Sequence, residues 1–246
     1  MQSEPNGSSL TFFEQGTEIS LLSEDSLLSY YRKRAEEYEL IYQKPERQKD
    51  LARLRDWLMG EMRDRDVLEV ACGTGYWTEH VARVARSVTA TDASGEVLDV
   101  ARQKSYPDGQ VQFVVADAFS LAGVPGTFTA ALAAFWFSHV ARCDQARFLK
   151  ALHGRLERGS AVVLLDNRYV EGSSTPISRR DADGNTYQLR MLRDGSAHEV
   201  LKNFPTASEL ERLFEPVVEH LSITEFDYFW ALRYDLPGGP SRRAFG

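Results

Sequence analysis

Residues 67–77, VLEVACGTGYW, form an apolar run that ends abruptly at two glycines flanking a threonine. A short apolar run bounded by glycine is typical of a buried strand followed by a tight turn. Glycine at such a turn lets the backbone approach another group closely, because no side chain stands in the way. The group that the backbone approaches here is a phosphate, a nucleoside or the next helix. Other parts of the sequence are needed to distinguish among these three.

A regular alternation of strands and helices surrounds this stretch. We predict strands at residues 67–71, 87–92, 111–117, 128–135 and 161–167, helices at 78–85, 94–105 and 144–159, and one or two final strands at 222–236. Continuous apolar strands that alternate with helices indicate a parallel sheet covered on both faces. The sequence therefore predicts a doubly wound, Rossmann-like α/β fold, in which ligands bind beyond the carboxyl ends of the strands.

The remaining segments frame one predicted domain at residues 27–236. Residues 1–26 lack sustained periodicity and are predicted to be a flexible segment, as is the tail at 237–246. Two helices are predicted within about residues 27–62, where apolar and aromatic side chains recur at helical spacing.

A hairpin is predicted at about residues 186–204, as an insertion between the fifth strand and the following helix. Asp194-Gly195 is a good signal for its turn. The next helix is predicted from Thr206 and Glu209, which stand three residues apart and form a capping-box pattern. The hairpin either covers the substrate or forms a dimer contact, and the sequence leaves both alternatives open.

Composition and charge narrow the class of protein. The 246 residues are 43% hydrophobic and 26% charged, with no apolar stretch near the roughly 20 residues of a membrane helix. The formal charge of −7 repels phosphate backbones, so no nucleic-acid partner is expected. Cys72 and Cys143 make neither a disulfide framework nor a metal cluster. With no basic start leading into an apolar core, we expect a cytoplasmic protein without a secretory signal, a membrane partner or a metal.

Two features of the glycine turn distinguish between kinds of ligand. A dinucleotide turn has the pattern G-x-G-x-x-G, in which the third small residue lets the helix pack closely on the strand. Counted from Gly73 and Gly75, that third place falls on Thr78. Glu69 lies inside the strand, where it would repel a pyrophosphate but pair with an ammonium group. These residues favour a ligand with an ammonium group over a dinucleotide.

Four motifs in order resemble those of the class I S-adenosylmethionine-dependent methyltransferases. They are LEVACGTG at residues 68–75, TATDAS at 89–94, VVADAFSL at 114–121 and AAFWFSHV at 133–140. The resemblance covers about residues 30–167 and includes small-molecule enzymes of quinone biosynthesis. It implies a seven-stranded, mostly parallel sheet with an N-terminal helical lid. It also implies S-adenosylmethionine as cofactor and in-line methyl transfer to an O, N, S or C nucleophile of a small molecule.

The resemblance also assigns cofactor contacts. By this resemblance Glu69 holds the ammonium group, Asp92 accepts from both ribose hydroxyls, Asp117 accepts from the adenine amine, and Ala134 lies near the sulfonium. Tyr30 and Tyr38 are the best matches to a lid that closes over the cofactor. The full predicted set is Tyr30, Tyr38, Glu69, Ala71, Gly73, Gly75, Asp92, Ala93, Asp117, Ala118, Phe119 and Ala134.

The acceptor pocket is predicted after the fourth and fifth strands and on the N-terminal helix. Its candidate residues are Tyr31, Phe135, Trp136, Asp166, Arg168 and Tyr169. His139 is the candidate general base, since histidine ordinarily titrates near neutral pH, and the alternative is a histidine bonded to backbone. Arg168 either neutralises an anionic substrate group or pairs with an acidic neighbour. If two or more of the aromatic side chains reach the pocket, a flat aromatic substrate is favoured.

Three other functions remain as alternatives. A NAD-dependent oxidoreductase is disfavoured by Thr78 and Glu69. A non-catalytic cofactor-binding partner subunit is disfavoured by the presence of all four motifs. A methyltransferase acting on protein or RNA is disfavoured by the acidic balance and because AAFWFS offers no amide to orient a planar amino group. We therefore predict an enzyme with a small-molecule substrate, acting as a monomer or a homodimer.

Overall fold

The computed structural model describes residue 39, residues 42–191 and residues 195–238. The predicted flexible N-terminal segment and most of the first predicted helix, with Tyr30, Tyr31 and Tyr38, lie outside the described residues. Most of the predicted tail and Asp194 of the predicted hairpin turn also lie outside them.

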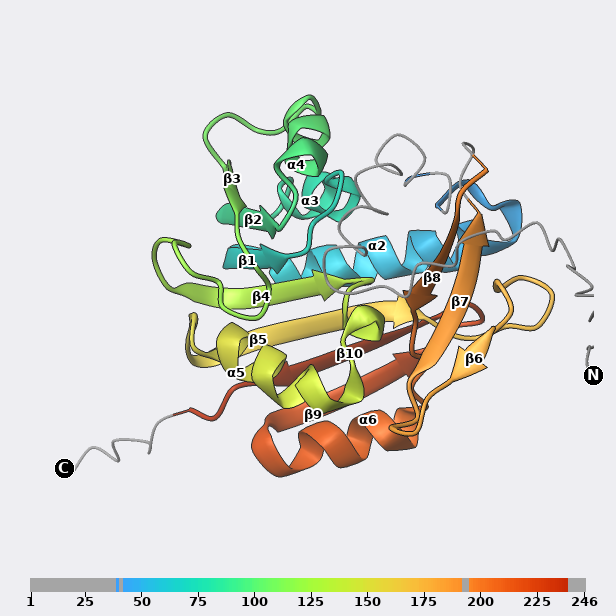
Figure 1. Ribbon diagram of the computed structural model, residues 1–246. Helices are drawn as coiled ribbons and strands as arrows, with labels where there is room; N and C mark the ends of the chain where they lie inside the picture. The colour runs from blue at the N-terminus through green and yellow to red at the C-terminus, as the bar shows by residue number, and fades with distance from the viewer. Residues whose placement is uncertain (1–38, 40–41, 192–194, 239–246) are drawn as a thin grey trace, which may run out of the picture.

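A seven-stranded sheet forms the centre of the molecule (Figure 1). Its order is β3-β2-β1-β4-β5-β10-β9, and β10 runs antiparallel to both of its neighbours. The strands are β1 (Asp66–Val70), β2 (Ser87–Asp92), β3 (Val111–Val115), β4 (Phe128–Ala134), β5 (Leu156–Asn167), β9 (Glu219–Glu225) and β10 (Phe229–Asp235). This arrangement confirms the predicted doubly wound, mostly parallel fold. Strand order reverses between β1 and β4, which places the expected ligand crevice beyond their carboxyl ends.

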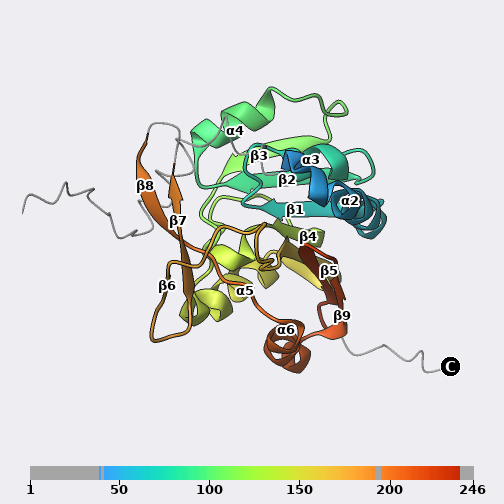
Figure 2. The same ribbon diagram turned by 90° about the vertical axis from the view of Figure 1, so that its right-hand side faces the viewer.

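Helices cover both faces of this sheet (Figure 2). One face carries α2 (Gln48–Met62), α3 (Tyr76–Val81) and α4 (Gly95–Arg102), and the other carries α5 (Gln145–His153) and α6 (Ala207–Phe214). In α2 the buried residues Leu51, Leu54 and Leu58 recur at intervals of three and four, so one stripe of the helix faces the sheet. Phe148 of α5 and Phe214 of α6 are fully buried against the opposite face. None of the described helices is long and apolar enough to span a membrane.

The helix predicted at residues 144–159 is shorter than expected. α5 ends at His153, and Gly154 occupies its C-cap. Leu156 already pairs with Phe128 in the sheet, so the residues after it belong to β5. Gly159 has φ 74°, a conformation that glycine adopts without strain, and the register of β5 against β4 shifts in this region. The glycine that was predicted to end the helix therefore lies within the strand.

A second, three-stranded sheet is built from β6 (Arg179–Arg180), β7 (Thr186–Met191) and β8 (Ala197–Leu201). The antiparallel pairing of β7 with β8 confirms the predicted hairpin, and β6 is an additional strand. This small sheet stands beyond the carboxyl ends of β4 and β5 (Figure 1). α6 follows it and begins with the predicted capping box between Thr206 and Glu209.

Candidate cofactor and acceptor site

The turn between β1 and α3 has a left-handed backbone at three positions. The φ angles are 53° at Ala71, 58° at Gly73 and 78° at Gly75. Glycine adopts this conformation readily, whereas alanine does so at a cost. The amide of Gly75 donates to the carbonyl of Cys72 at 3.1 Å, which closes the turn directly before α3.

Gly75 packs closely against α4, and this contact is a reason for glycine besides the predicted approach to a ligand. A Cβ at this position would lie 2.6 Å from the Tyr106 hydroxyl and 3.1 Å from Cβ of Ala101 in α4. Tyr106 is held in place because its hydroxyl donates to the carbonyl of Ala101 at 2.9 Å. The sequence assigned both glycines of the motif to the ligand. The structure gives Gly75 a distinct reason, the close contact with α4.

We expect Gly75→Ala to lower the free energy of unfolding by about 2–4 kcal/mol, from backbone strain and overpacking together. Gly109→Ala is the matched control, because Gly109 has φ 72° but no atom of the described residues lies within 4 Å of its added Cβ. The free energy of unfolding of the control should fall by only about 1–2 kcal/mol. Urea unfolding measures both, and the cost of Gly75→Ala should be smaller in a Tyr106→Phe background. Equal costs for the two glycines would contradict the packing explanation.

Asp92 joins the ends of the first two strands. Its Oδ2 accepts from the amide of Gly73 at 3.0 Å, and its Oδ1 accepts from the amide of Ser94 at 3.0 Å. Ser94 in turn caps α4 by accepting from the amide of Val97. The carboxylate is thereby fixed at the carboxyl end of β2, beside the glycine turn and next to the exposed Ala93. A carboxylate held in this way presents acceptors to a ligand in the crevice.

Glu69 is a buried carboxyl group inside β1, beside the glycine turn. Its side chain is 1% exposed, and neither of its oxygens has a hydrogen-bond partner among the described residues. Burial raises the pKa of Glu69 to about 8, and the Thr78 hydroxyl and the Lys104 ammonium lower it by smaller amounts. Buried polar groups in folded proteins are normally satisfied, so an unpaired carboxyl beside the glycine turn points to a ligand with a donor or positive charge.

The end of β3 contributes a turn and an aromatic ring. Asp117 is exposed, and its Oδ1 accepts from the amide of Phe119 at 2.7 Å. Ala118 is buried, and the ring of Phe119 packs against that of Trp136 with centroids 6.2 Å apart. Trp136 is partly exposed, and its buried indole nitrogen has no hydrogen-bond partner among the described residues. These side chains from two strand ends meet at one edge of the crevice.

Phe135 lies in the core rather than in an acceptor pocket, which corrects the predicted position. It directly follows Ala134, the last residue of β4, and its φ of 60° is unusual for a bulky side chain. That backbone conformation turns the ring toward Tyr42, Trp77 and Phe229, at centroid distances of 5.6, 5.9 and 5.6 Å.

His139 follows in the short helix η3 (Phe137–His139) and is 8% exposed. Its Nδ1 lies 2.6 Å from the carbonyl oxygen of Leu201, the last residue of β8. A carbonyl oxygen only accepts hydrogen bonds, so Nδ1 carries a proton. The neutral ring then has its basic lone pair on Nε2, which is the arrangement a general base needs. The two alternatives predicted for His139, a general base and a histidine bonded to backbone, are therefore compatible with each other.

The two charged residues predicted at the pocket rim after β5 both have protein partners. Asp166 is 0% exposed, so it does not lie at an open rim. Its Oδ1 accepts from Lys202 Nζ at 2.7 Å. Arg168 donates to the carbonyl of Phe226 at 2.6 Å and lies 3.3 Å from Glu225, so it faces the turn between β9 and β10. Tyr169 is 37% exposed.

Sequence reasoning missed two contributions to the site. Lys202 enters it from the end of β8, and nothing in the stretch EVLKNF distinguishes this lysine from a surface residue. Glu39, from the segment before α2, accepts from the Thr74 hydroxyl at 2.9 Å and also pairs with Lys104. Both contacts join residues far apart in the chain, so only the folded structure reveals them.

Fold and site together define a class: a doubly wound α/β protein that binds a nucleoside-type cofactor with a cationic group. The family model described as "Methyltransferase domain" matches residues 67–159. Demethylmenaquinone methyltransferase from Staphylococcus aureus is 31% identical over 175 residues, covering 64% of this chain and 68% of that protein. The chain belongs to the class I S-adenosylmethionine-dependent methyltransferases, the family that its four motifs predicted.

Other relatives agree. Ubiquinone biosynthesis O-methyltransferase from Xanthomonas euvesicatoria is 31% identical over 153 residues, which span 61% of this chain but only 60% of that relative's length. A structure of DhpI in complex with SAM and HEP superimposes with a TM-score of 0.71 at 27% identity, covering 86% of this chain and 96% of that one. S-adenosylmethionine is the cofactor of the family, and the unpaired Glu69 beside the turn suits its ammonium group. The alternative of a NAD-dependent oxidoreductase finds no support in these matches.

Proposed function

We propose that this protein transfers a methyl group from S-adenosylmethionine to a hydroxyl group of a small molecule. The observation that carries the proposal is Glu69, the next-to-last residue of β1, a fully buried carboxyl with no hydrogen-bond partner among the described residues. Leaving such a group unpaired is costly. The ammonium group of S-adenosylmethionine would remove that cost, whereas a pyrophosphate in the same place would raise it.

The other cofactor contacts follow the strand ends. Asp92, already fixed by two backbone amides, would accept from the ribose hydroxyls, with Ala93 beside the adenine. Asp117 would accept from the adenine amine, and Phe119 would line the ring. Ala134 ends β4 and would lie near the sulfonium. When bound, the cofactor supplies a methyl group activated by positively charged sulfur, so the protein has to align the acceptor and exclude water.

His139 is the proposed general base for the acceptor. A hydroxyl nucleophile carries a proton that it does not lose unaided near neutral pH, so a base within reach accelerates its attack. Nδ1 of His139 bonds to the carbonyl of Leu201, so in the neutral ring the basic lone pair is on Nε2, the proposed acceptor of the proton. This arrangement favours an O–H acceptor over a nucleophile that is already free of a proton.

The acceptor is proposed to be a small aromatic molecule. The Xanthomonas relatives are named as O-methyltransferases of ubiquinone biosynthesis. On the acceptor side of this chain, the exposed Tyr169 packs edge-on against Phe204 with ring centroids 5.4 Å apart. Both follow strand ends that approach His139, and aromatic walls suit a flat ring. Because Cys72 and Cys143 are both free thiols, we further propose that the enzyme acts in the reducing cytoplasm.

We expect the binding of S-adenosylmethionine to release close to one proton at about pH 7. With a pKa of about 8, Glu69 is protonated below that pH in the free protein. An ammonium group beside it favours the carboxylate, so the proton leaves on binding. Calorimetry in buffers of different ionisation enthalpy measures this number, which should fall toward zero as the pH rises above about 8.

Glu69→Gln should remove the proton release and weaken binding roughly 10- to 100-fold, because an amide gives no charge-assisted contact. A screen of hydroxylated aromatic acceptors, with S-adenosylhomocysteine as the detected product, completes the test. Micromolar binding of NAD without binding of S-adenosylmethionine would overturn the proposed function. The predicted monomeric or homodimeric state stays a prediction.

A further inference from the structure

The backbone on both sides of His139 is tied to the chain that leaves β8. The amide of Asn203 donates to the carbonyl of Ser138 at 2.8 Å. The side-chain amide of Asn203 donates to the carbonyl of Val140 at 3.2 Å. Leu201, whose carbonyl accepts from His139, lies only two residues before Asn203. The end of β8 and the helix η3 therefore form one hydrogen-bonded unit around the histidine.

Lys202 fastens this unit to the main sheet. Its ammonium donates to the Ser138 hydroxyl at 2.6 Å and to Oδ1 of Asp166 at 2.7 Å. The other carboxylate oxygen of Asp166 accepts from the amide of Ser138 at 3.1 Å. The backbone amide of Lys202 donates to the carbonyl of Thr186 in β7 at 2.8 Å. One lysine thus joins β5, η3 and both strands of the hairpin.

The burial of this ion pair is hard to explain by stability alone. The side chain of Lys202 is 4% exposed and that of Asp166 is 0% exposed. Removing two charges from water is costly, and apolar residues of similar size often stabilise a protein equally well. In some proteins a buried ion pair instead fixes one geometry among several that apolar packing would allow. Here the geometry that is fixed is the position of the Leu201 carbonyl relative to the His139 ring.

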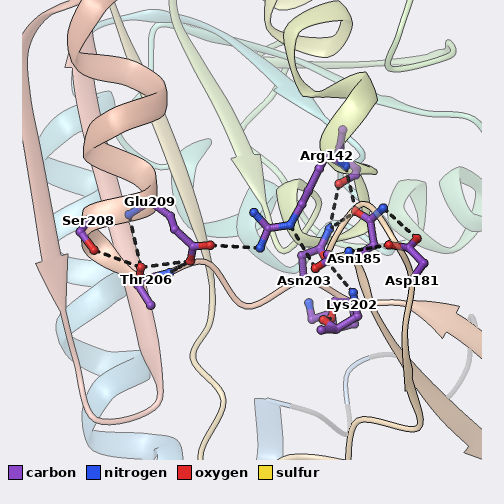
Figure 3. A network of polar contacts seen from close by, with 11 residues as sticks. Arg142, Asp181, Asn185, Lys202, Asn203, Thr206, Ser208 and Glu209 are labelled. Carbon is purple, nitrogen blue, oxygen red and sulfur yellow. Dashed lines mark hydrogen bonds and ion pairs between the residues drawn. The ribbon is translucent and has the colours of Figure 1, made fainter.

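A wider polar network holds the same end of the hairpin (Figure 3). Asn185, just before β7, accepts from the backbone amide of Arg142 at 2.9 Å and from the side chain of Asn203 at 3.1 Å. Arg142 also pairs with Glu209 at the start of α6 at 3.1 Å. These contacts join the hairpin of β7 and β8 to the segment after η3 and to α6. The ion pair of Lys202 is therefore one part of a larger hydrogen-bonded network.

We propose that Lys202 is a positioning residue for methyl transfer, holding the Leu201 carbonyl so that His139 keeps its proton on Nδ1 and its lone pair on Nε2. The three-stranded sheet of β6, β7 and β8 then contributes to methyl transfer by orienting the His139 ring. The inference rests on the proposed function, because it assigns Lys202 to the general base of that reaction. Lys202 itself touches neither reactant in this arrangement.

The test compares the tautomer of His139 in wild-type and variant proteins, by nitrogen-15 NMR of labelled histidine with the ring neutral. The wild type should show a protonated Nδ1 and an unprotonated Nε2. In Lys202→Met the Leu201 carbonyl loses the anchor that ties it to Asp166, and a mixture of tautomers is expected. The double variant Lys202→Met/Asp166→Asn removes both charges, so it avoids an unpaired buried carboxylate and should give the same mixture in a folded protein.

Turnover of a hydroxylated aromatic acceptor should fall about 10- to 100-fold in these variants, with the Kd of S-adenosylmethionine within about twofold of wild type. Glu199→Gln is the control: Glu199 lies on β8 and pairs with Arg179 of β6, so its loss should leave the tautomer of His139 unchanged.

A folded double variant with the wild-type tautomer would overturn the proposal, as would a wild type with its proton on Nε2. If S-adenosylmethionine does not bind the wild type, the proposed function fails instead, whatever the tautomer shows.

Discussion

Asp92→Ala is expected to weaken S-adenosylmethionine binding by at least about 100-fold. Two hydrogen bonds from ribose hydroxyls to a carboxylate contribute roughly 1.5–3 kcal/mol each, and the substitution removes both. It also removes the acceptor for the amides of Gly73 and Ser94, so the turn itself loses support. Isothermal titration with S-adenosylmethionine and S-adenosylhomocysteine measures the loss.

The matched control is Asp99→Ala. Asp99 lies on α4, the helix that starts beside Asp92, but it is exposed and pairs with Arg102 at the surface. Its removal should leave the affinity within about twofold, because surface ion pairs contribute little. Circular dichroism of Asp92→Ala separates a lost contact from a lost fold. A folded Asp92→Ala protein with near-normal affinity would show that the ribose contact is misplaced.

His139→Ala is expected to lower kcat by about 100- to 10,000-fold, the usual contribution of a general base. The affinity for S-adenosylmethionine should stay nearly unchanged, because His139 lies beyond β4 and bonds to β8, not to the glycine turn. Steady-state kinetics with a hydroxylated aromatic acceptor, together with titration of the cofactor, separates the two quantities.

The control for that experiment is His220→Ala. His220 is 74% exposed and pairs with Asp235 at the edge of the main sheet, so its loss should not change turnover. A His139→Ala protein with the wild-type kcat would remove His139 from the mechanism and leave the acceptor to lose its proton without help.

Much of the fold was predictable because its signals are local. β2 begins and ends at the predicted residues, since an apolar run of fixed length is visible in the sequence alone. Ser94 and Thr206 were predictable as caps because each bonds to an amide three residues further on. The end of α5 was not predictable from local signals, because Leu156 pairs with Phe128 and the chain there joins the sheet. Long-range pairing overrides local preference there.

The site shows the same division. The sequence by itself determined the family, the cofactor and the strand ends at which Glu69 and Asp92 stand, because these follow from motifs within a few residues of each other. Only the tertiary structure decided which side chains are available. It placed Phe135 in the core, paired Asp166 with Lys202 and set the Nδ1 proton of His139. Each of these depends on contacts between residues distant in the chain, and a side chain's direction, burial and protonation are fixed only by such contacts.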